Sequence, residues 1–448
     1  MSELVLENIN KKELPKCWSF CKVGDVCDVL GGKRLPKGHV YSDNKTTYPY
    51  VRVVDFKNMG IDITSLKYLK PETTKEISKY TISKNDLYIS IAGSIGRVGI
   101  IPEFLDNAYL TENAGKLCKI KIDKKFLCHV LNSQYCQQQI STLTKSTTQP
   151  KLALFRIKEI SLPVPPLNEQ KRIVAKIEEL FSLLEFVKQT LEKIEYRLNL
   201  YRRSLLKNIF NKIPSQILFS RIAHINPIPE KDRFSDDLDV SFLPMRNVQE
   251  MTGKMDASIT RKFKEVKKGY TFFEEGDLLF AKITPCMENG KIAIAQGLTN
   301  KIGFGSTEFH VIRFKNNDML TKFYFWYLIQ DEFRNLAQQN MKGTAGQLRV
   351  PTDYLKNILV PHTSKDEQNK VIMEIEENIT KIEVQQNLIY LSLRNINSLK
   401  HTILKQAFEG KLLPQDPTDE PAEILLEKIK QEKQKIISQT KRGKKNDK

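Results

Sequence analysis

The chain has 448 residues, a formal net charge of +18 and a pI near 9.3, which allow two or three domains and suit a polyanionic partner. The same charge would also fit a soluble protein from a lysine-rich proteome. The sequence lacks both an apolar run of eighteen residues and a signal-peptide core, so we expect no membrane span, no membrane partner and no secretion. Seven cysteines without a dense framework favour reduced thiols and a cytoplasmic location.

The first part of the chain predicts a short leader and a globular domain. We assign residues 1–16 to the leader and 17–166 to the domain. Strand candidates are apolar runs between turn-rich stretches, at 48–54, 87–92, 98–101 and 117–122. An amphipathic helix is expected over 126–143, and a basic, hydroxyl-rich loop follows at 145–151.

Residues 167–213 predict one long helix. The stretch from Leu167 to Ile213 contains neither glycine nor proline, and prolines stand on both sides. Apolar residues recur in alternating steps of four and three, which is typical of a coiled-coil seam: Ile173, Ile177, Leu180, Leu184, Val187, Leu191, Ile194, Leu198, Tyr201 and Leu205. About 45 residues at roughly 1.5 Å each would make a rod of roughly 65 Å.

The second half of the chain predicts the same order of elements. Residues 214–363 form a second globular domain, with strands expected at 278–283, 291–295 and 309–314, a helix at 319–341 and a loop at 342–349. A second rod spans 364–410, where isoleucine recurs every seventh residue from Ile375 to Ile403. Asn378, Gln385 and Ser392 are polar notches that favour a fixed register.

Gly410 is expected to cap the second rod. The remainder, 411–448, predicts a short charged helix over 422–438 and a disordered basic tail from Lys441.

The two halves are an internal repeat. Pro163 and Glu169-Gln170 recur as Pro361 and Glu367-Gln368 at a constant offset of 198 residues. Asp86-Leu87 matches Asp277-Leu278 at 191, and Thr111-Glu112 matches Thr307-Glu308 at 196. We therefore predict an α+β chain with an approximate internal twofold axis: two similar mixed α/β domains, separated by two long antiparallel helices that form a coiled coil.

Three segments resemble the specificity subunits of type I restriction–modification systems. They are the junction Leu162–Val174, the ending Ile403–Leu412 with Pro414–Pro417 behind it, and Gly276–Phe280. The resemblance covers essentially the whole chain, including the repeat. It implies two target-recognition domains that each read one half of a split site in double-stranded DNA. It also implies long helices that set the spacer and dock two modification subunits. One departure is Pro361-His362-Thr363-Ser364, which replaces the Pro-Pro-Leu form and argues against identical docking at both junctions.

We predict no catalytic, metal or cofactor residue in this chain. Asn226-Pro227-Ile228-Pro229 lacks the adjacent prolines and the aromatic of an adenine methyltransferase motif, and no Walker loop for ATP occurs. The resemblance instead places S-adenosylmethionine on the modification subunits and ATP on the restriction subunits. Two rival hypotheses remain, a coiled-coil scaffold that binds protein only and a self-sufficient enzyme.

Candidate DNA contacts are donor side chains on loops of the two domains, and for each of them a solvated surface charge is the competing interpretation. Arginine, asparagine and glutamine more often read bases, whereas lysine more often holds phosphates, so we expect Arg34, Arg52, Gln149, Arg246, Asn247 and Gln347 to read bases. The full set is Lys33, Arg34, Arg52, Lys57, Arg97, Lys145, Thr148, Gln149 and Lys151 in the first domain, and Arg246, Asn247, Lys282, Lys291, Lys342, Gln347 and Arg349 in the second.

Overall fold

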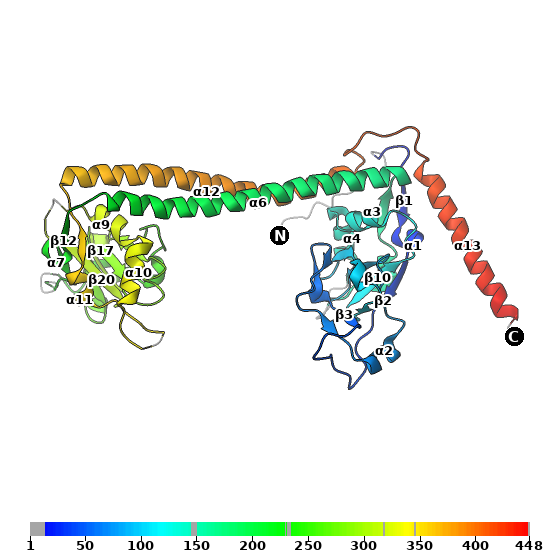
Figure 1. Ribbon diagram of the computed structural model, residues 1–448, viewed down its shortest axis with the longest axis horizontal. Coiled ribbons are helices and arrows are strands. Elements are labelled where there is room, and N and C mark those ends of the chain that lie inside the picture. Colours follow the sequence, from blue (N-terminus) through cyan, green and yellow to red (C-terminus); the bar gives the residue numbers. More distant parts are fainter. Residues whose placement is uncertain are drawn as a thin grey trace. The chain divides into compact units, whose positions relative to one another are not determined.

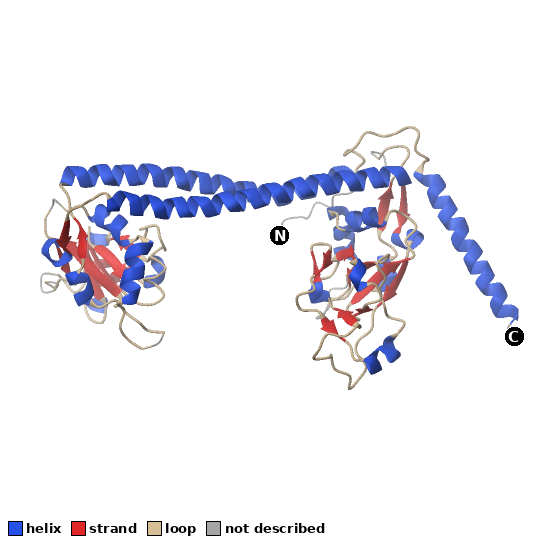
Figure 2. Cartoon of the chain, viewed as in Figure 1, coloured by secondary structure: helices blue, strands red, loops and turns tan. Residues whose placement is uncertain are grey.

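The computed structural model describes residues 14–144, 150–228, 230, 234–316, 319–344 and 346–446. It divides into two compact units (Figure 1). Unit 1 contains the chain up to Gln189 and again from Ser392, and unit 2 is Thr190–Leu391. Helices α6 (Leu167–Asn211) and α12 (Lys365–Phe408) each begin in one unit and end in the other. Figure 2 shows the strands confined to the globular parts.

Unit 1 holds a mixed α/β domain. A four-stranded antiparallel sheet has the order β2-β10-β7-β8, and a three-stranded sheet, β6-β3-β9, contains one parallel pair, β3 with β9. The pair β1 and β11 joins the domain to α6. The elements are β1 (Ser19–Lys22), α1 (Val23–Val26), β2 (Asp28–Gly31), β3 (Pro49–Val51), η2 (Val53–Asp55), β4 (Phe56–Lys57), β5 (Gly60–Ile61), β6 (Lys67–Tyr68), α2 (Pro71–Ile77), β7 (Leu87–Ser90), β8 (Val98–Ile100), η3 (Glu103–Leu105), β9 (Tyr109–Leu110), β10 (Ala114–Cys118), α3 (Lys124–Leu131), α4 (Gln134–Leu143), α5 (Leu154–Ile157), β11 (Ser161–Val164) and, from the C-terminal part, α13 (Ala422–Asn446).

Unit 2 repeats this topology with one additional strand, β16, in its second sheet. Its four-stranded antiparallel sheet has the order β13-β20-β17-β18, and the sheet β15-β14-β19-β16 again contains one parallel pair, β14 with β19. The pair β12 and β21 corresponds to β1 and β11. The elements are β12 (Gln216–Leu218), α7 (Phe219–Ile222), β13 (Ala223–Ile225), β14 (Asp239–Leu243), η5 (Met245–Asn247), β15 (Thr260–Lys262), α8 (Phe263–Val266), β16 (Thr271–Glu274), β17 (Leu278–Ala281), β18 (Ile292–Ile294), η6 (Thr299–Lys301), β19 (Ile302–Gly305), β20 (Phe309–Phe314), α9 (Thr321–Leu328), α10 (Asp331–Gln339), α11 (Thr352–Asn357) and β21 (Leu359–Pro361).

Strand register corrects one landmark of the repeat. Ser90 pairs with Ala114 in unit 1, and Ala281 pairs with Phe309 in unit 2. The backbone N–H of Thr111 donates to Val51, and the N–H of Ser306 donates to Leu243, at the same place in each fold. Thr111 therefore corresponds to Ser306, so matching Thr111-Glu112 to Thr307-Glu308 was wrong by one residue. The two Thr-Glu dipeptides are similar in sequence without being equivalent in position.

The two long helices run antiparallel within each unit. In unit 1 the start of α6, at Ile173 and Ile177, shares a core with Phe408 near the end of α12. In unit 2 the end of α6, at Phe210, shares a core with the start of α12 at Ile375. Burial of these seam residues is the main source of pairing energy, and it confirms the predicted antiparallel arrangement.

A buried glutamine anchors each globular domain to its long helix. The Gln170 side chain accepts from the N–H of Asp123 at 2.9 Å and donates to the carbonyl of Pro165 at 2.9 Å. Gln368 does the same with the N–H of Leu320 at 3.0 Å and the carbonyl of Thr363 at 2.9 Å. Both side chains are fully buried. This anchor gives a physical reason for the constant spacing of the Glu-Gln pair, and it survives the departure from the Pro-Pro-Leu form.

Three expected elements have different bounds. The single helix expected at 126–143 is two helices, α3 and α4, because Ser133 caps a new start by accepting from the N–H of Cys136. The helix expected at 319–341 is likewise split into α9 and α10. The strand expected at 117–122 lies earlier, at 114–118, where its residues pair with both β2 and β7.

The C-terminal part of unit 1 is more helical than expected. Helix α13 continues through Lys441 to Asn446, so a disordered tail beginning at Lys441 was wrong; lysine and arginine, which dominate this end, are good helix formers. The helix rests on β1 and α1, with Ile429 buried and Lys433 donating to the Gly24 carbonyl at 2.7 Å. Among the described helices, none combines the length and the apolarity that a bilayer crossing requires.

Candidate nucleic-acid interface

The loop after β2 presents two of the predicted contacts in unit 1. A side chain at Gly32 would place Cβ only 2.1 Å from the Thr111 carbonyl, so the backbone can pass there only as glycine. The N–H of Lys33 then donates to the Leu110 carbonyl at 2.8 Å, which fixes where the loop leaves the sheet. Lys33 and Arg34 are exposed as a result.

Arg34 lies on a hollow of about 500 Å³, where its Nε donates to Glu112 at 2.8 Å. The second carboxylate oxygen of Glu112 accepts from the Thr111 hydroxyl at 2.9 Å. The hydrogen bond to Glu112 raises the pKa of Arg34, and the arginine side chain stays 78% exposed. The guanidinium is thus held at one nitrogen and presents its other donors outward.

Three other predicted contacts of unit 1 are engaged within the domain. Arg52 donates to the fully buried carboxylate of Asp55 at 2.8 Å and to the Ser65 carbonyl at 2.7 Å, and only 23% of its side chain is exposed. Lys57 donates to Asp62 at 2.5 Å, and Arg97 donates to the Phe56 carbonyl at 3.0 Å. These bonds favour a structural contribution from Arg52, because leaving Asp55 unpaired would be costly.

The loop at 145–151 is described only at its end. Lys145, Thr148 and Gln149 lie outside the described residues. Lys151 is exposed and forms a backbone bridge with Ala92, next to the end of β7.

The predicted contacts of unit 2 fall into two groups. The first surrounds η5, where Arg246 is exposed, the Asn247 amide donates to the Asp256 carbonyl at 3.2 Å, and Lys291 Nζ donates to the Met245 carbonyl at 3.2 Å. The second lies where β17 ends and β20 begins, and it contains Lys282, Lys342, Gln347 and Arg349.

The second group is built around Glu308. Arg349 donates to its carboxylate through Nε at 2.9 Å and through Nη2 at 2.8 Å, and this bond lowers the pKa of Glu308. Lys282 follows β17 directly, and its N–H donates to the Glu308 carbonyl at 2.9 Å. Burial lowers the pKa of Lys282, whereas Lys342 and Gln347 are exposed.

Three residues at these edges escaped the sequence analysis. In the sequence, Glu112 and Glu308 stand out only as landmarks of the repeat, because carboxylates are not donors to bases or phosphates. Val54 stands at the tip of η2, where unit 2 has Arg246 at the tip of η5, and it is 64% exposed. An exposed valine fits contact with a thymine methyl group, just as an exposed arginine fits a base edge.

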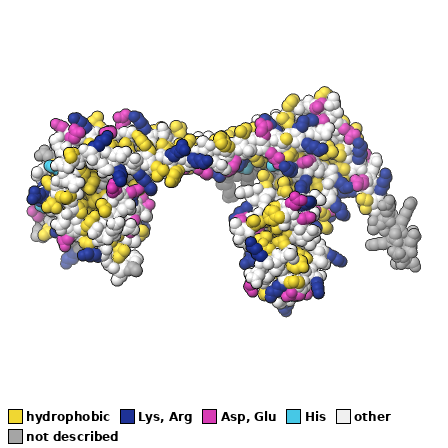
Figure 3. Space-filling view, viewed as in Figure 1, with side chains coloured by type: hydrophobic (Ala, Val, Ile, Leu, Met, Phe, Trp, Pro, Cys, Tyr) yellow, Lys and Arg dark blue, Asp and Glu magenta, His cyan; other side chains and the backbone are white. Residues whose placement is uncertain are grey.

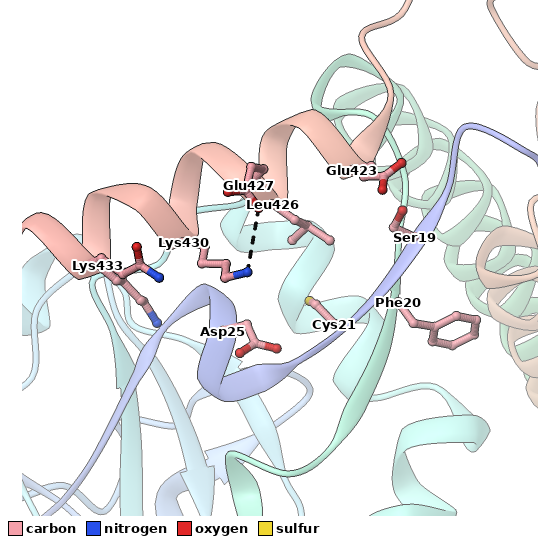
Figure 4. A pocket seen from close by; sticks show the side chains of 10 residues that line it. Ser19, Phe20, Cys21, Asp25, Glu423, Leu426, Glu427, Lys430 and Lys433 are labelled. Atoms are coloured by element: carbon pink, nitrogen blue, oxygen red, sulfur yellow. Dashed lines mark ion pairs between the residues drawn. The ribbon is translucent and has the colours of Figure 1, made fainter.

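Charge alone does not mark the interface. On the face visible in Figure 3, basic and acidic side chains are interspersed on both units. A separate hollow of about 480 Å³ in unit 1 lies between α13 and β1 (Figure 4). Its lining mixes Asp25, Glu423 and Glu427 with Lys430 and Lys433, and none of the predicted contacts lies there.

Comparisons with known proteins agree on one family. A family model described as the type I restriction modification DNA specificity domain matches residues 15–196 and 220–390. The EcoAI specificity subunit of Escherichia coli is 34% identical, over 50% of this chain and 44% of that protein, so the match spans less than half of that relative. The EcoKI specificity subunit of Escherichia coli is 23% identical over 94% of this chain and 96% of that protein.

Two solved structures share the fold. A chain from a type I restriction–modification system has a TM-score of 0.65 at 16% identity, covering 89% of this chain and 99% of that chain. The HsdS subunit from Thermoanaerobacter tengcongensis has a TM-score of 0.58 at 17% identity, covering 89% of this chain and 98% of that chain.

Proposed function

The chain belongs to the family of type I restriction–modification DNA specificity proteins, and we propose that it is the DNA-recognition subunit of such a system. Each globular domain reads one half of a bipartite site in double-stranded DNA. The observation that carries this proposal is the duplicated fold: two domains share one sheet topology but expose different donors, Arg34 in unit 1 and Arg246 and Gln347 in unit 2. Different donors on one frame suit two different half-sites.

The long helices fix the spacing between the half-sites and dock two modification subunits. In unit 2 the seam residues Ile382 and Ile389 are buried against the chain itself, whereas Val384 and Leu388 on another face of α12 are 55% and 58% exposed. Exposed apolar side chains on a rigid helix support a protein-binding role for that face. Because both helices continue between the two units, their length is the natural measure of the gap.

Chemistry belongs to the partner subunits in this proposal. The described residues at these edges include Arg34 and Arg349, each paired with a glutamate and still partly exposed, and arginine donors suit phosphate contact and base reading. We assign S-adenosylmethionine to the modification subunits and ATP to the restriction subunits, with the assembled complex in the cytoplasm.

Salt dependence separates this proposal from a scaffold that binds protein only. The assembled complex of this chain with its modification subunits should bind duplex DNA with an affinity that falls about 1,000-fold between 50 and 200 mM salt, as expected for roughly six phosphate contacts. A complex that assembles but shows no salt-dependent binding to duplex DNA would support the scaffold.

Rod length offers a second test. Seven residues inserted into α6, with seven at the facing position of α12, would lengthen the pair by about 10 Å, or about three base pairs, and keep the seam in phase. We expect methylation to move to sites with a longer spacer. Unchanged spacer length in an active variant would contradict the ruler role.

A further inference from the structure

Arg349 is held by Glu308 in a two-point pair. Its Nε and Nη2 donate to the two carboxylate oxygens of Glu308 at 2.9 and 2.8 Å, the parallel geometry that fixes the plane of a guanidinium. Its Nη1 donates to the Gln347 carbonyl at 3.1 Å. The side chain nevertheless remains 40% exposed.

The donor count shows what this pair leaves over. A guanidinium carries five N–H groups, one on Nε and two on each terminal nitrogen. Within the described part of the chain, Glu308 and Gln347 take one hydrogen from each nitrogen. One N–H therefore remains on Nη1 and one on Nη2. Two N–H donors on the terminal nitrogens of an arginine form the fork that meets O6 and N7 of guanine in the major groove.

The backbone beside Arg349 is held as firmly as its side chain. The N–H and carbonyl of Arg349 pair with those of Lys342 at 2.9 Å each, which closes the loop. The next residue, Val350, is buried; its N–H donates to the Lys282 carbonyl, and its own carbonyl bonds His310 Nε2 at 2.8 Å. The fork is thus fixed before DNA arrives, which lowers the entropic cost of binding.

We propose that Arg349 reads a guanine in the half-site of unit 2 and that Glu308 is its positioning residue. This inference rests on the proposed DNA-recognition function and deepens it. Glu308 itself faces the side of the guanidinium away from the base, so it acts through Arg349.

Unit 1 contains a second glutamate–arginine pair, Glu112 with Arg34, which serves as a control for the pair of Glu308 with Arg349. Glu112 holds Arg34 through Nε alone and spends its other oxygen on Thr111. It belongs to a different place in the fold, since Thr307 is its structural counterpart. Substitutions at Glu112 should therefore affect the other half-site, and none at Glu308 should do so.

The test uses the complete complex with its modification subunits and maps the methylated motif in a host genome. Wild type should give a bipartite motif with a guanine in the half-site of unit 2. Arg349→Ala and Arg349→Lys should each lower the preference for that guanine by about 10- to 100-fold, because lysine keeps the charge but lacks the fork. Glu308→Gln should lower it by about 2- to 10-fold and leave every other position unchanged.

Matched controls separate reading from folding. Glu265→Gln removes an exposed carboxylate of α8 in the same unit and should leave the motif intact. Arg349→Lys and Glu308→Gln preserve side-chain size, so their melting temperatures should stay close to wild type. A motif that keeps every base in all three variants, or that changes at a base other than guanine, overturns the inference while the proposed function stands. A wild-type complex without a bipartite motif overturns both.

Discussion

The two units differ far more in the exposed side chains of their loops than in their sheet topology and in the bonds that hold each domain to its long helix. Gln170 and Gln368 make the same pair of bonds to the same two places in the fold. The glutamates that directly precede them differ in their surroundings. Glu169 is buried and accepts from the indole of Trp18 at 3.0 Å, whereas Glu367 is half exposed and pairs with Lys370 on its own helix. The two halves of the repeat therefore share the glutamine bonds that hold each domain to its long helix, and they differ in the contacts of the preceding glutamate.

The outer edges show the same divergence more strongly. At the tip of one short helix, Val54 in unit 1 faces outward where unit 2 has Arg246. Inside the sheet, at the second residue of β10 and of β20, Gly115 in unit 1 corresponds to the buried His310 in unit 2. A fixed frame with exchangeable edge residues is what reading two different half-sites requires.

The largest expected effect concerns Arg52, which sequence analysis grouped with Arg246. Arg52→Ala should lower the free energy of unfolding of unit 1 by about 4 kcal/mol, because Asp55 is fully buried and would lose its ion-pair partner. Arg246→Ala removes an exposed side chain and should change stability by less than about 0.5 kcal/mol. Amide hydrogen exchange in β7 and β17 would report each unit separately. Equal losses of unfolding free energy for Arg52→Ala and Arg246→Ala would contradict the expected difference between a structural and an exposed arginine.

Acid should destabilise unit 2 through His310, a titratable residue whose counterpart in unit 1 is Gly115. Burial lowers the pKa of His310 from its ordinary 6.5 to about 4, and the neutral ring bonds Asn226 and Val350. Because the folded state disfavours protonation, this stability is fully present above pH 6.5 and is lost as the pH falls towards 4. The loss should reach about 3 kcal/mol.

Unfolding of unit 2 between pH 7 and 4 measures the His310 effect, and His310→Gln should remove that part of the slope. A slope that persists in His310→Gln would assign the acid sensitivity to other groups.

A smaller difference is expected at the Glu-Gln pairs. Burial raises the pKa of Glu169, yet its carboxylate satisfies Trp18 Nε1 and the amide of Gln415. Glu169→Ala should cost unit 1 about 2 kcal/mol, since the buried indole N–H would lose its acceptor. Glu367→Ala should cost unit 2 less than about 0.5 kcal/mol. The ratio of the two costs, measured by denaturant titration, is the informative quantity, and a larger cost at Glu367 would contradict the account.

Sequence periodicity was sufficient for the two long helices and their antiparallel pairing, because the heptad is a local, repeating signal. It was not sufficient for the whole seam: Val187, Ile194 and Tyr201 were predicted to face the partner helix but are 44%, 41% and 50% exposed. The repeat was visible at Glu169-Gln170 and Glu367-Gln368, because a fully buried glutamine with two fixed hydrogen bonds must keep the same place relative to its domain and its helix. Helix breaks were missed at Ser133, since a cap is a single hydrogen bond inside an apolar pattern. The off-by-one match at Thr111-Glu112 had a related cause: only strand pairing reveals register.

The edges were harder to predict than the frame. Counting donors selected Arg52 together with Arg34, but only the structure shows that Arg52 pairs with a fully buried carboxylate and Arg34 with a partly exposed one. It also overlooked Glu308, because the sequence does not show that this acidic residue pairs with Arg349.

The central claim is that two domains of similar topology each read a different half-site. The most direct test is the methylation pattern of the assembled complex. Co-expression of the chain with its neighbouring modification subunit, followed by mapping of methylated adenines across the host genome, would give the recognised motif. The account predicts two short defined half-sites separated by an unspecified spacer. A continuous motif, or no methylation in a complex shown to assemble, would contradict it.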